Sequence, residues 1–241
     1  MLPESPDVSV VVPAFREAPN LRPLAERVFA ATRGAGLDAE LIIVDDSSGD
    51  GSAEIVADLA ALFPVRIIVR TNERGLSSAV LRGFQEARGP FLVVMDADLS
   101  HPPEAIPDLV APVREGRADF ALGSRYVSGG HIDQDWSLFR HLNSRIATWL
   151  ARPLTSVRDP MSGFFCLARA SLDRAAPLNP VGYKIALELI VKTRSRRCLE
   201  VPISFADRAA GTSKLTAREQ LRYLRHLARL YWFRIAGPQK R

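Results

Sequence analysis

The chain has 241 residues, and its 47% hydrophobic and 24% charged content is ordinary for a globular protein. Its two cysteines, Cys166 and Cys198, form no C-x-x-C pair, which argues against a disulfide framework or a zinc site and fits a reducing compartment. The net charge is +5, but residues 212–241 alone carry +7, which leaves −2 for the rest of the chain.

At this length we expect one large domain, or one domain with an appendage. No stretch approaches the ~18 consecutive apolar residues that a membrane-spanning helix needs. No basic and then apolar leader precedes the first apolar run at Val8. We therefore expect a cytosolic protein, or one attached to the cytosolic face of a membrane.

Strand-like and helix-like segments alternate in the first half of the chain. Apolar runs typical of strands occupy residues 8–13, 40–44, 65–70, 91–95 and 118–122, and helical spacing occurs at about 20–34, 52–63, 76–87 and 104–115. This alternation predicts an α/β fold with a mostly parallel sheet covered on both faces. After Gly123 we expect helices at 137–151, 182–194 and 216–236, and extended segments at 162–168 and 198–205.

The most informative segment is FLVVMDADLSHPPE, residues 91–104, in which Asp96 and Asp98 directly follow a predicted buried strand. In an extended chain, side chains two residues apart point to the same face, so we expect these carboxylates to lie close together. Their repulsion favours a hard divalent cation, typically Mg²⁺ or Mn²⁺, which also binds substrate phosphates. The alternative is a solvated turn that happens to hold two aspartates. The strand end favours the metal, because open α/β sheets bind ligands there.

Two earlier strand ends carry residues that could meet a nucleotide. The first strand ends in VVPAFREAPN, where Pro13 fixes the backbone, Phe15 could lie against a base and Glu17 could reach a ribose or a base edge. The second strand ends in IIVDDSSGDGS, where Asp46 could accept a hydrogen bond from a base N–H. The alternative for this acidic turn is that it simply caps the following helix.

For two histidine-containing segments we favour a structural role over a metal site. His101, which follows the aspartate pair, is taken as a residue of the turn or a support behind it, not as a metal ligand. Residues 131–135, HIDQD, could form a second metal site, but we favour a mobile, solvated loop because no partner histidine lies at ligand spacing.

Seven motifs along the chain resemble, in their order, those of glycosyltransferase family 2. They are VVPAFREAPN, IVDDSSGDG, NERGLSSAVLRGF, VMDADLSHPPE, GSRYVSGG, DPMSGFF and GTSKLT, and together they span about residues 7–215. Within the family the chain resembles the polyprenyl-phosphate (dolichol-phosphate) mannosyltransferases, and DADLSHPPE is the most specific element. The resemblance implies a GT-A-like fold, with a catalytic domain over residues 1–215 and a basic amphipathic C-terminal helix over residues 216–241.

The resemblance also implies a role for each matching residue. The donor site would comprise Pro13, Phe15, Glu17, Val44, Asp46, Asp96, Ala97, Asp98, Arg125, Lys184, Arg208 and Lys214, of which Asp96, Asp98 and Arg125 are the catalytic ones. Asp98 would bind the metal, and Ser100 stands where some relatives place a metal-ligating Gln. Arg140 and Ser144 would hold the phosphate of the acceptor.

The implied reaction is the transfer of mannose from GDP-mannose to a polyprenyl phosphate, with inversion to a β-linked product and with Mg²⁺ or Mn²⁺ as cofactor. Two alternatives stay open: a family 2 transferase of glucose or another sugar, and a donor-binding subunit that needs a membrane partner. A dinucleotide oxidoreductase is disfavoured because no G-x-G-x-x-G follows the first strand. The implied partners are GDP-mannose, the lipid phosphate, an anionic membrane surface and optionally a membrane protein, but no nucleic acid.

The final predicted helix combines an apolar stripe with a row of arginines. The stripe is Leu221, Leu224, Leu227, Ala228, Tyr231, Trp232 and Ile235, and Arg218, Arg222, Arg225 and Arg229 lie alongside it. Such a helix either packs on its own domain or lies on an anionic membrane surface. Because a lipid-phosphate acceptor is anchored in a membrane, we expect a cytoplasmic protein that attaches peripherally to the cytoplasmic face.

Overall fold

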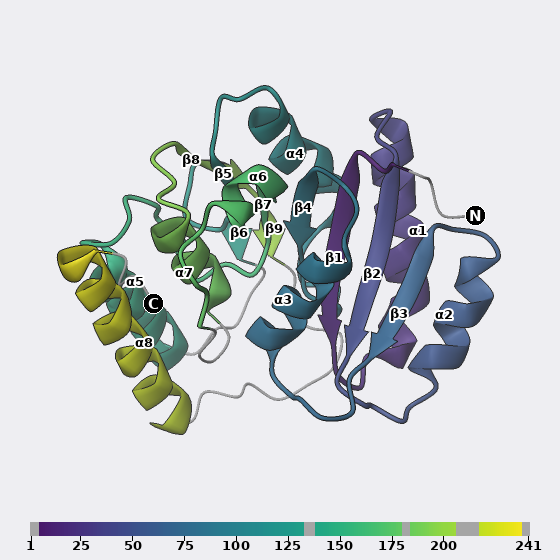
Figure 1. Cartoon of the computed structure of the whole chain (residues 1–241), viewed down its shortest axis with the longest axis horizontal. Coiled ribbons are helices and arrows are strands. Elements are labelled where there is room, and N and C mark those ends of the chain that lie inside the picture. Colours follow the sequence, from purple (N-terminus) through teal and green to yellow (C-terminus); the bar gives the residue numbers. More distant parts are fainter. Residues whose placement is uncertain (1–4, 133–137, 180–183, 206–216, 238–241) are drawn as a thin grey trace.

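A seven-stranded sheet runs through the computed structural model, which describes residues 5–132, 138–179, 184–205 and 217–237 (Figure 1). Its strands lie in the order β3-β2-β1-β4-β7-β5-β8, and β6 pairs with β9 in a separate small sheet. The bounds are β1 Val8–Ala14, β2 Ala39–Asp45, β3 Val65–Val69, β4 Phe91–Val94, β5 Phe120–Ser124, β6 His131–Ile132, β7 Phe165–Ala168, β8 Cys198–Pro202 and β9 Ser204–Phe205.

Helices cover both faces of the sheet, as the alternation predicts (Figure 1). They are α1 Ala18–Gly34, α2 Ser52–Ala60, α3 Leu76–Glu86, α4 Ile106–Arg114, α5 Leu138–Ala151, α6 Arg169–Asp173, α7 Ile185–Lys192 and α8 Ala217–Ala236, with a 3₁₀ turn over Pro103–Ala105 before α4. Helices α1, α2 and α4 bury apolar side chains on one face, and α3 and α7 on the other. For residues 132, 138–144 and 217–219 only the backbone is described.

The carboxyl ends of β1, β2, β3 and β4 lie at one edge of the sheet. β1 pairs in parallel with β2 and with β4, so that Val8 lies opposite Ala39 on one side and Phe91 on the other. Every residue of β1 except Pro13 is buried, because a sheet covered on both faces needs apolar side chains on both. In Figure 1 the arrowheads of β1, β2 and β3 point to the lower edge, where open α/β sheets bind ligands.

Strand β7 departs from the parallel pattern. It is antiparallel to both of its neighbours, with Phe165 opposite Val94 of β4 and Leu122 of β5. Its amino-terminal end therefore lies at the edge where β4 and β5 have their carboxyl ends. This reversal brings residues 159–164 next to the segments that follow β4 and β5. The prediction of a mostly parallel sheet flanked by helices is confirmed, with β7 as the exception.

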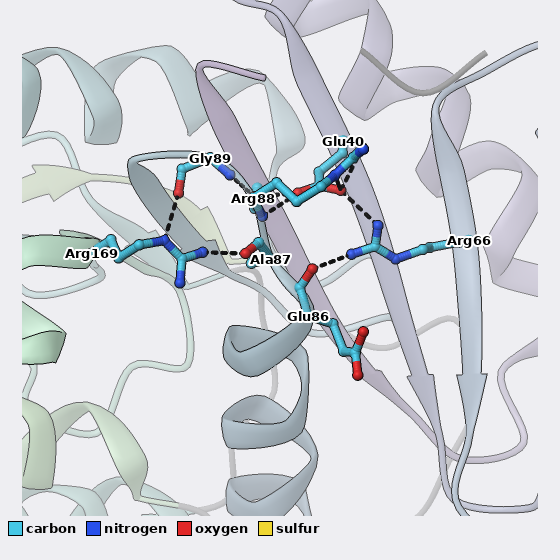
Figure 2. A network of polar contacts seen from close by, with 8 residues as sticks. Glu40, Arg66, Glu86, Ala87, Arg88, Gly89 and Arg169 are labelled. Carbon is cyan, nitrogen blue, oxygen red and sulfur yellow. Dashed lines mark hydrogen bonds and ion pairs between the residues drawn. The ribbon is translucent and has the colours of Figure 1, made fainter. Parts of the chain in front are cut away.

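An ion-pair network at the opposite edge fixes the connection from α3 to β4 (Figure 2). The fully buried Glu40 carboxylate accepts hydrogen bonds from the guanidinium groups of Arg66 and Arg88. Arg66 and Arg169 also donate to main-chain carbonyls at the end of α3 and just after it. These carbonyls lack partners within the helix and carry partial negative charge, which a guanidinium satisfies. The chain thus enters β4, and the turn after it, from a fixed position.

Helix α8 packs on α5 and α7 through one of its faces. Leu227 and Leu230 of α8 are buried in an apolar cluster with Leu187 and Val191 of α7. The Tyr231 hydroxyl donates a 2.6 Å hydrogen bond to a carbonyl of α5. Among the described residues, no helix combines the length and the apolar character that crossing a membrane requires.

Candidate active site

The turn after β4 holds the aspartate pair. Because β4 ends at Val94, Asp96 and Asp98 lie in this turn and not in the extended chain that the strand pattern predicts. The turn closes through Leu99, whose φ of 61° is left-handed. The buried Asp98 carboxylate accepts hydrogen bonds at Oδ1 from the Ser100 N–H (3.1 Å) and the Ser100 hydroxyl (2.6 Å). Ser100 therefore orients Asp98, and its role as a metal ligand stays a prediction.

His101 supports this turn from the buried side. Its Nδ1 accepts the Asp96 N–H at 3.1 Å, and its ring stacks on that of Phe164 with centroids 5.3 Å apart. Burial lowers the pKa of His101, and this effect outweighs the raising effects of nearby Asp96 and Asp98. A neutral imidazole is the form that can accept a hydrogen bond at Nδ1. His101 therefore acts as a support for the aspartate turn.

Arg125, directly after β5, forms a buried ion pair with Asp159. Its Nε and Nη2 each donate a 2.8 Å hydrogen bond to the carboxylate, and its backbone N–H donates a third at 3.1 Å. The side chains of Arg125 and Asp159 are only 9% and 0% exposed, so water hardly screens the attraction between their charges. The guanidinium also lies 5.1 Å from the ring centroid of Phe205. Asp159 thus fixes Arg125 in position and orientation.

Lys184, directly before α7, belongs to the same electrostatic cluster. Loss of water around its ammonium group, together with the nearby charge of Arg125, lowers the pKa of Lys184 to about 8, although Asp159 and Asp96 act in the opposite direction. An anion bound at this point would favour the charged ammonium. The cluster therefore offers two positive groups for an anionic ligand beside the aspartate turn.

The ends of β1 and β2 provide an aromatic ring and a carboxylate. The Phe15 ring is partly exposed, and the guanidinium carbons of Arg16 and Arg74 lie 5.3 and 5.5 Å from its centroid. The buried Asp46 carboxylate accepts hydrogen bonds from Arg70 and from the main chain of the loop before α3. An exposed ring and a carboxylate at neighbouring strand ends suit a nucleotide base, which stacks and donates hydrogen bonds.

The other residues predicted for the site divide into two groups. Pro13, Glu17, Val44 and Ala97 lie in or after β1, β2 and β4, at the carboxyl edge. Arg208, Lys214 and residues 133–135 lie outside the described residues, and of Arg140 and Ser144 in α5 only the backbone is described. His131 and Ile132 form the strand β6, so the expected loop at 131–135 is wrong at its first two residues.

The aspartate turn fits a divalent cation that is shared with a ligand. Within the described residues no group of three or more His, Cys, Asp or Glu could hold a metal ion by itself. Mg²⁺ is typically bound by one or two carboxylates together with substrate phosphates and water, and Asp96 and Asp98 supply that number. The positive groups of Arg125 and Lys184 lie near Asp96, as a diphosphate ligand would require.

The structure adds residues that the sequence pattern does not single out. Asp159 holds Arg125, and Arg70 holds Asp46. Each lies within or next to a motif already noted, but no rule of spacing connects it with its partner. Only a chemical argument could have found these partners: a buried arginine or aspartate needs a side chain of opposite charge nearby.

Comparison with known families and proteins identifies the family of this chain. Residues 9–174 match the family model described as glycosyl transferase family 2. The chain belongs to this family. Three curated family relatives carry the name dolichol-phosphate mannosyltransferase. The protein of Mycosarcoma maydis is 51% identical over 95% of this chain and 81% of its own length, and that of Saccharomyces cerevisiae 48% over 96% and 89%. The Pyrococcus furiosus protein is 44% identical over 92% of this chain and 63% of its own length.

Solved structures agree with the GT-A-like fold. Glucosyl-3-phosphoglycerate synthase from Mycobacterium tuberculosis, in complex with phosphoglyceric acid, has a TM-score of 0.69 at 22% identity and covers 98% of this chain and 82% of that one. The same protein with Mn²⁺, UDP and glucosyl-3-phosphoglycerate gives a TM-score of 0.67 at 21% identity, with the same coverage. At 21–22% identity these similarities show that this chain has the GT-A-like fold, and nothing further.

Proposed function

We propose that this family 2 enzyme transfers mannose from GDP-mannose to a dolichyl-type polyprenyl phosphate and gives polyprenyl phosphate β-mannose. The names of the relatives at 44–51% identity support the sugar and the acceptor. The observation that carries the proposal is the grouping of Asp96, Arg125 and Lys184 at the carboxyl edge of the sheet. This grouping suits a sugar diphosphate, which needs neutralisation of its charge.

The acceptor brings its own nucleophile to the reaction. The second pKa of a phosphate monoester is about 6, so an acceptor oxygen is largely ionised near neutral pH. Attack of this oxygen on the anomeric carbon, opposite the departing diphosphate, inverts the configuration at that carbon. No side chain has to remove a proton, and the protein's contribution is to position both substrates.

The departing diphosphate accumulates negative charge as the sugar–oxygen bond breaks. Arg125 and Lys184 stabilise this charge by hydrogen bonding and by their positive charge. Asp96 and Asp98 would hold the divalent cation, which supplies further charge neutralisation when it is bound. Arg208 and Lys214 are proposed for the same diphosphate, and Arg140 and Ser144 for the acceptor phosphate, on the basis of the family resemblance.

We also propose that α5 and α8 attach the protein peripherally to the cytoplasmic face of a membrane. Where the side chains of these helices are described, the large apolar ones that are exposed are Ile146, Trp149, Leu221, Leu224, Trp232 and Ile235. Among the described side chains on or directly after the same helices, the exposed arginines are Arg145, Arg152, Arg222, Arg225, Arg229 and Arg234. Apolar groups with aromatic rings and a surrounding of cations suit an anionic lipid surface. A lipid acceptor requires such proximity.

A donor panel tests the proposed function. The purified chain would be incubated with a short dolichyl phosphate, Mg²⁺ or Mn²⁺, and each of GDP-mannose, GDP-glucose, UDP-glucose and UDP-N-acetylglucosamine. Transfer from GDP-mannose should be much faster than from the other donors. Preferred transfer from a UDP-sugar would contradict the proposed donor, and the absence of transfer from every donor would contradict the proposed function.

A further inference from the structure

One short segment contacts both charged parts of the active site. Asp159 precedes β7 and holds Arg125 through three hydrogen bonds. Four residues later, Gly163 lies so close to the aspartate turn that an added Cβ would be 3.3 Å from Asp96 Oδ1. Phe164 follows and stacks on His101, which accepts the Asp96 N–H. The antiparallel strand β7 thus delivers a segment that connects the two sides of the site.

The Asp159 carboxylate is fully engaged in holding Arg125. Oδ2 accepts the Arg125 backbone N–H and the Nε–H, and Oδ1 accepts an Nη2–H. The residue is 0% exposed, so water does not compete for these contacts. Both oxygens of this buried carboxylate are therefore occupied by charge-assisted hydrogen bonds from Arg125. Its geometry suits holding a cation and not removing a proton from the acceptor.

Glu200 of β8 in turn holds the segment that carries Asp159. Its Oε1 accepts the Asp159 N–H at 3.0 Å, and its Oε2 accepts the Arg158 N–H at 2.8 Å. Since β8 pairs in parallel with β5, the strand that leads into Arg125, both anchors belong to the same part of the sheet. Two carboxylates therefore act in series, from the sheet to the segment and from the segment to the guanidinium.

We propose that Asp159 is a positioning residue for the transfer reaction, which acts only through Arg125, and that Glu200 sets the position of Asp159. The pair presents Arg125 to the diphosphate at a fixed point beside Asp96. The guanidinium is already ordered before the donor binds. No conformational entropy of Arg125 is therefore lost on binding, and its full electrostatic stabilisation of the transition state is kept. This inference rests on the proposed function, since it assigns Arg125 to the donor diphosphate.

A double-mutant cycle tests the inference directly. The variants are Asp159→Asn, Arg125→Lys and the double variant, and the readouts are the Kd for GDP and kcat/KM for the nucleotide sugar. Asp159→Asn should weaken both readouts by about 10- to 100-fold, the range seen when groups that orient metal-binding side chains are removed. In the Arg125→Lys background the same substitution should change them by less than about threefold, because interacting residues are not additive.

A pH profile separates positioning from proton transfer. If Asp159 acts through Arg125, Asp159→Asn lowers kcat/KM by a similar factor across the pH range and leaves the shape of the profile unchanged. If the acid limb of the profile disappears in this variant, Asp159 serves as a base and the inference is wrong. Glu200→Gln, which keeps one acceptor oxygen of two, should give a smaller loss of the same kind, and it replaces Asp159→Asn in the cycle if that variant does not fold.

Asp119→Asn is the matched control. At the other end of β5, Asp119 accepts the N–H groups of Arg196 and Arg197 and a guanidinium N–H of Arg197 at 2.7 Å. This substitution should lower the melting temperature without changing the Kd for GDP. An equal loss of GDP binding in the control would show that Asp159→Asn acts through general stability and would overturn the inference.

The activity of the wild-type protein distinguishes a failure of the proposed function from a failure of the role assigned to Asp159. Absence of sugar transfer by the wild type contradicts the proposed function, whatever the variants do. Transfer by the wild type, together with equal effects of Asp159→Asn in the wild-type and Arg125→Lys backgrounds, contradicts only the role assigned to Asp159.

Discussion

Arg70 and Asp46 form a buried ion pair where β3 and β2 end. The Arg70 Nε donates a 2.8 Å hydrogen bond to Asp46 Oδ1, and Nη2 donates to the same oxygen. The Gly75 N–H donates to Asp46 Oδ2 at 2.7 Å, and Arg70 also donates to the Ser78 hydroxyl at 2.8 Å. One carboxylate thus ties β2 to the loop before α3. The residue expected to meet the nucleotide is held in place before a ligand arrives.

Removing Arg70 should therefore be costly. In Arg70→Ala the Asp46 carboxylate stays buried without its counter-ion, and loss of one partner of a buried pair costs about 3–5 kcal/mol. Chemical denaturation should show this loss, and GDP binding should weaken because Asp46 is no longer fixed. Arg82→Ala, which removes an exposed pair with Glu86, is the control and should cost at most about 1 kcal/mol. Unchanged stability of Arg70→Ala would show that the pair contributes nothing.

Asp98→Ala should stop transfer while the fold is kept. The substitution removes the carboxylate that Ser100 orients, and with it the support for a divalent cation. Loss of one preorganised electrostatic group typically costs on the order of 10²–10³ in rate. Mg²⁺-dependent tightening of GDP binding, measured by calorimetry, should also disappear. Asp58→Ala on the exposed face of α2 is the control. Wild-type turnover by Asp98→Ala, or by the wild type in excess EDTA, would contradict the metal assignment.

Lys184 should make GDP binding sensitive to alkaline pH. With its pKa lowered to about 8, Lys184 is charged below this pH and loses its charge as the pH rises through it. GDP affinity should therefore fall between about pH 7.5 and 9.5, a range in which the phosphates of GDP do not titrate. Lys184→Arg keeps its charge throughout this range and should flatten the profile. An unchanged alkaline fall in Lys184→Arg would assign it to another group.

The exposed face of α8 should determine attachment to vesicles. The predicted single stripe divides into two: Leu227 is buried, whereas Leu224, Trp232 and Ile235 are exposed, so both the packing and the surface interpretation describe part of the helix. Replacing these three exposed residues by Ser should reduce co-sedimentation with anionic vesicles without unfolding the protein. The remaining attraction is screened over about 8 Å at physiological salt and should fall as salt rises.

Leu62→Ser is the control for the vesicle experiment. Leu62 is 65% exposed and lies just after α2, and α2 lies at the opposite end of the molecule from α5 and α8 (Figure 1). This variant should bind vesicles like the wild type. If the α8 variant also binds anionic vesicles undiminished, attachment depends on another surface or on a membrane-protein partner.

The sequence predicts the first half of the fold well because local patterns determine it. Alternating buried strands and amphipathic helices identify every strand up to β5 and the helices between them. The direction of β7 could not be predicted, since residues 165–168 form a short apolar run that fits a parallel or an antiparallel neighbour equally well. Only contacts between distant segments decide this direction.

Part of the candidate site can be proposed from the sequence because local patterns mark it as well. Asp96 and Asp98 stand out because charged residues directly follow a buried strand. Asp159 and Arg70 do not, because their function depends on a partner 34 or 24 residues away in the chain. The sequence leaves a turn at Asp96 and Asp98 open as an alternative to an extended strand end, and the end of β4 at Val94 decides between the two.

The most direct test of the proposed mannosyl transfer is the product that the purified chain alone forms from GDP-mannose and a short dolichyl phosphate in the presence of Mg²⁺. We predict dolichyl phosphate mannose with inverted, β configuration at the anomeric carbon, which nuclear magnetic resonance of the product can establish. An α-linked product would contradict the direct displacement, and a chain that binds GDP-mannose but transfers nothing would contradict its assignment as the mannosyltransferase itself.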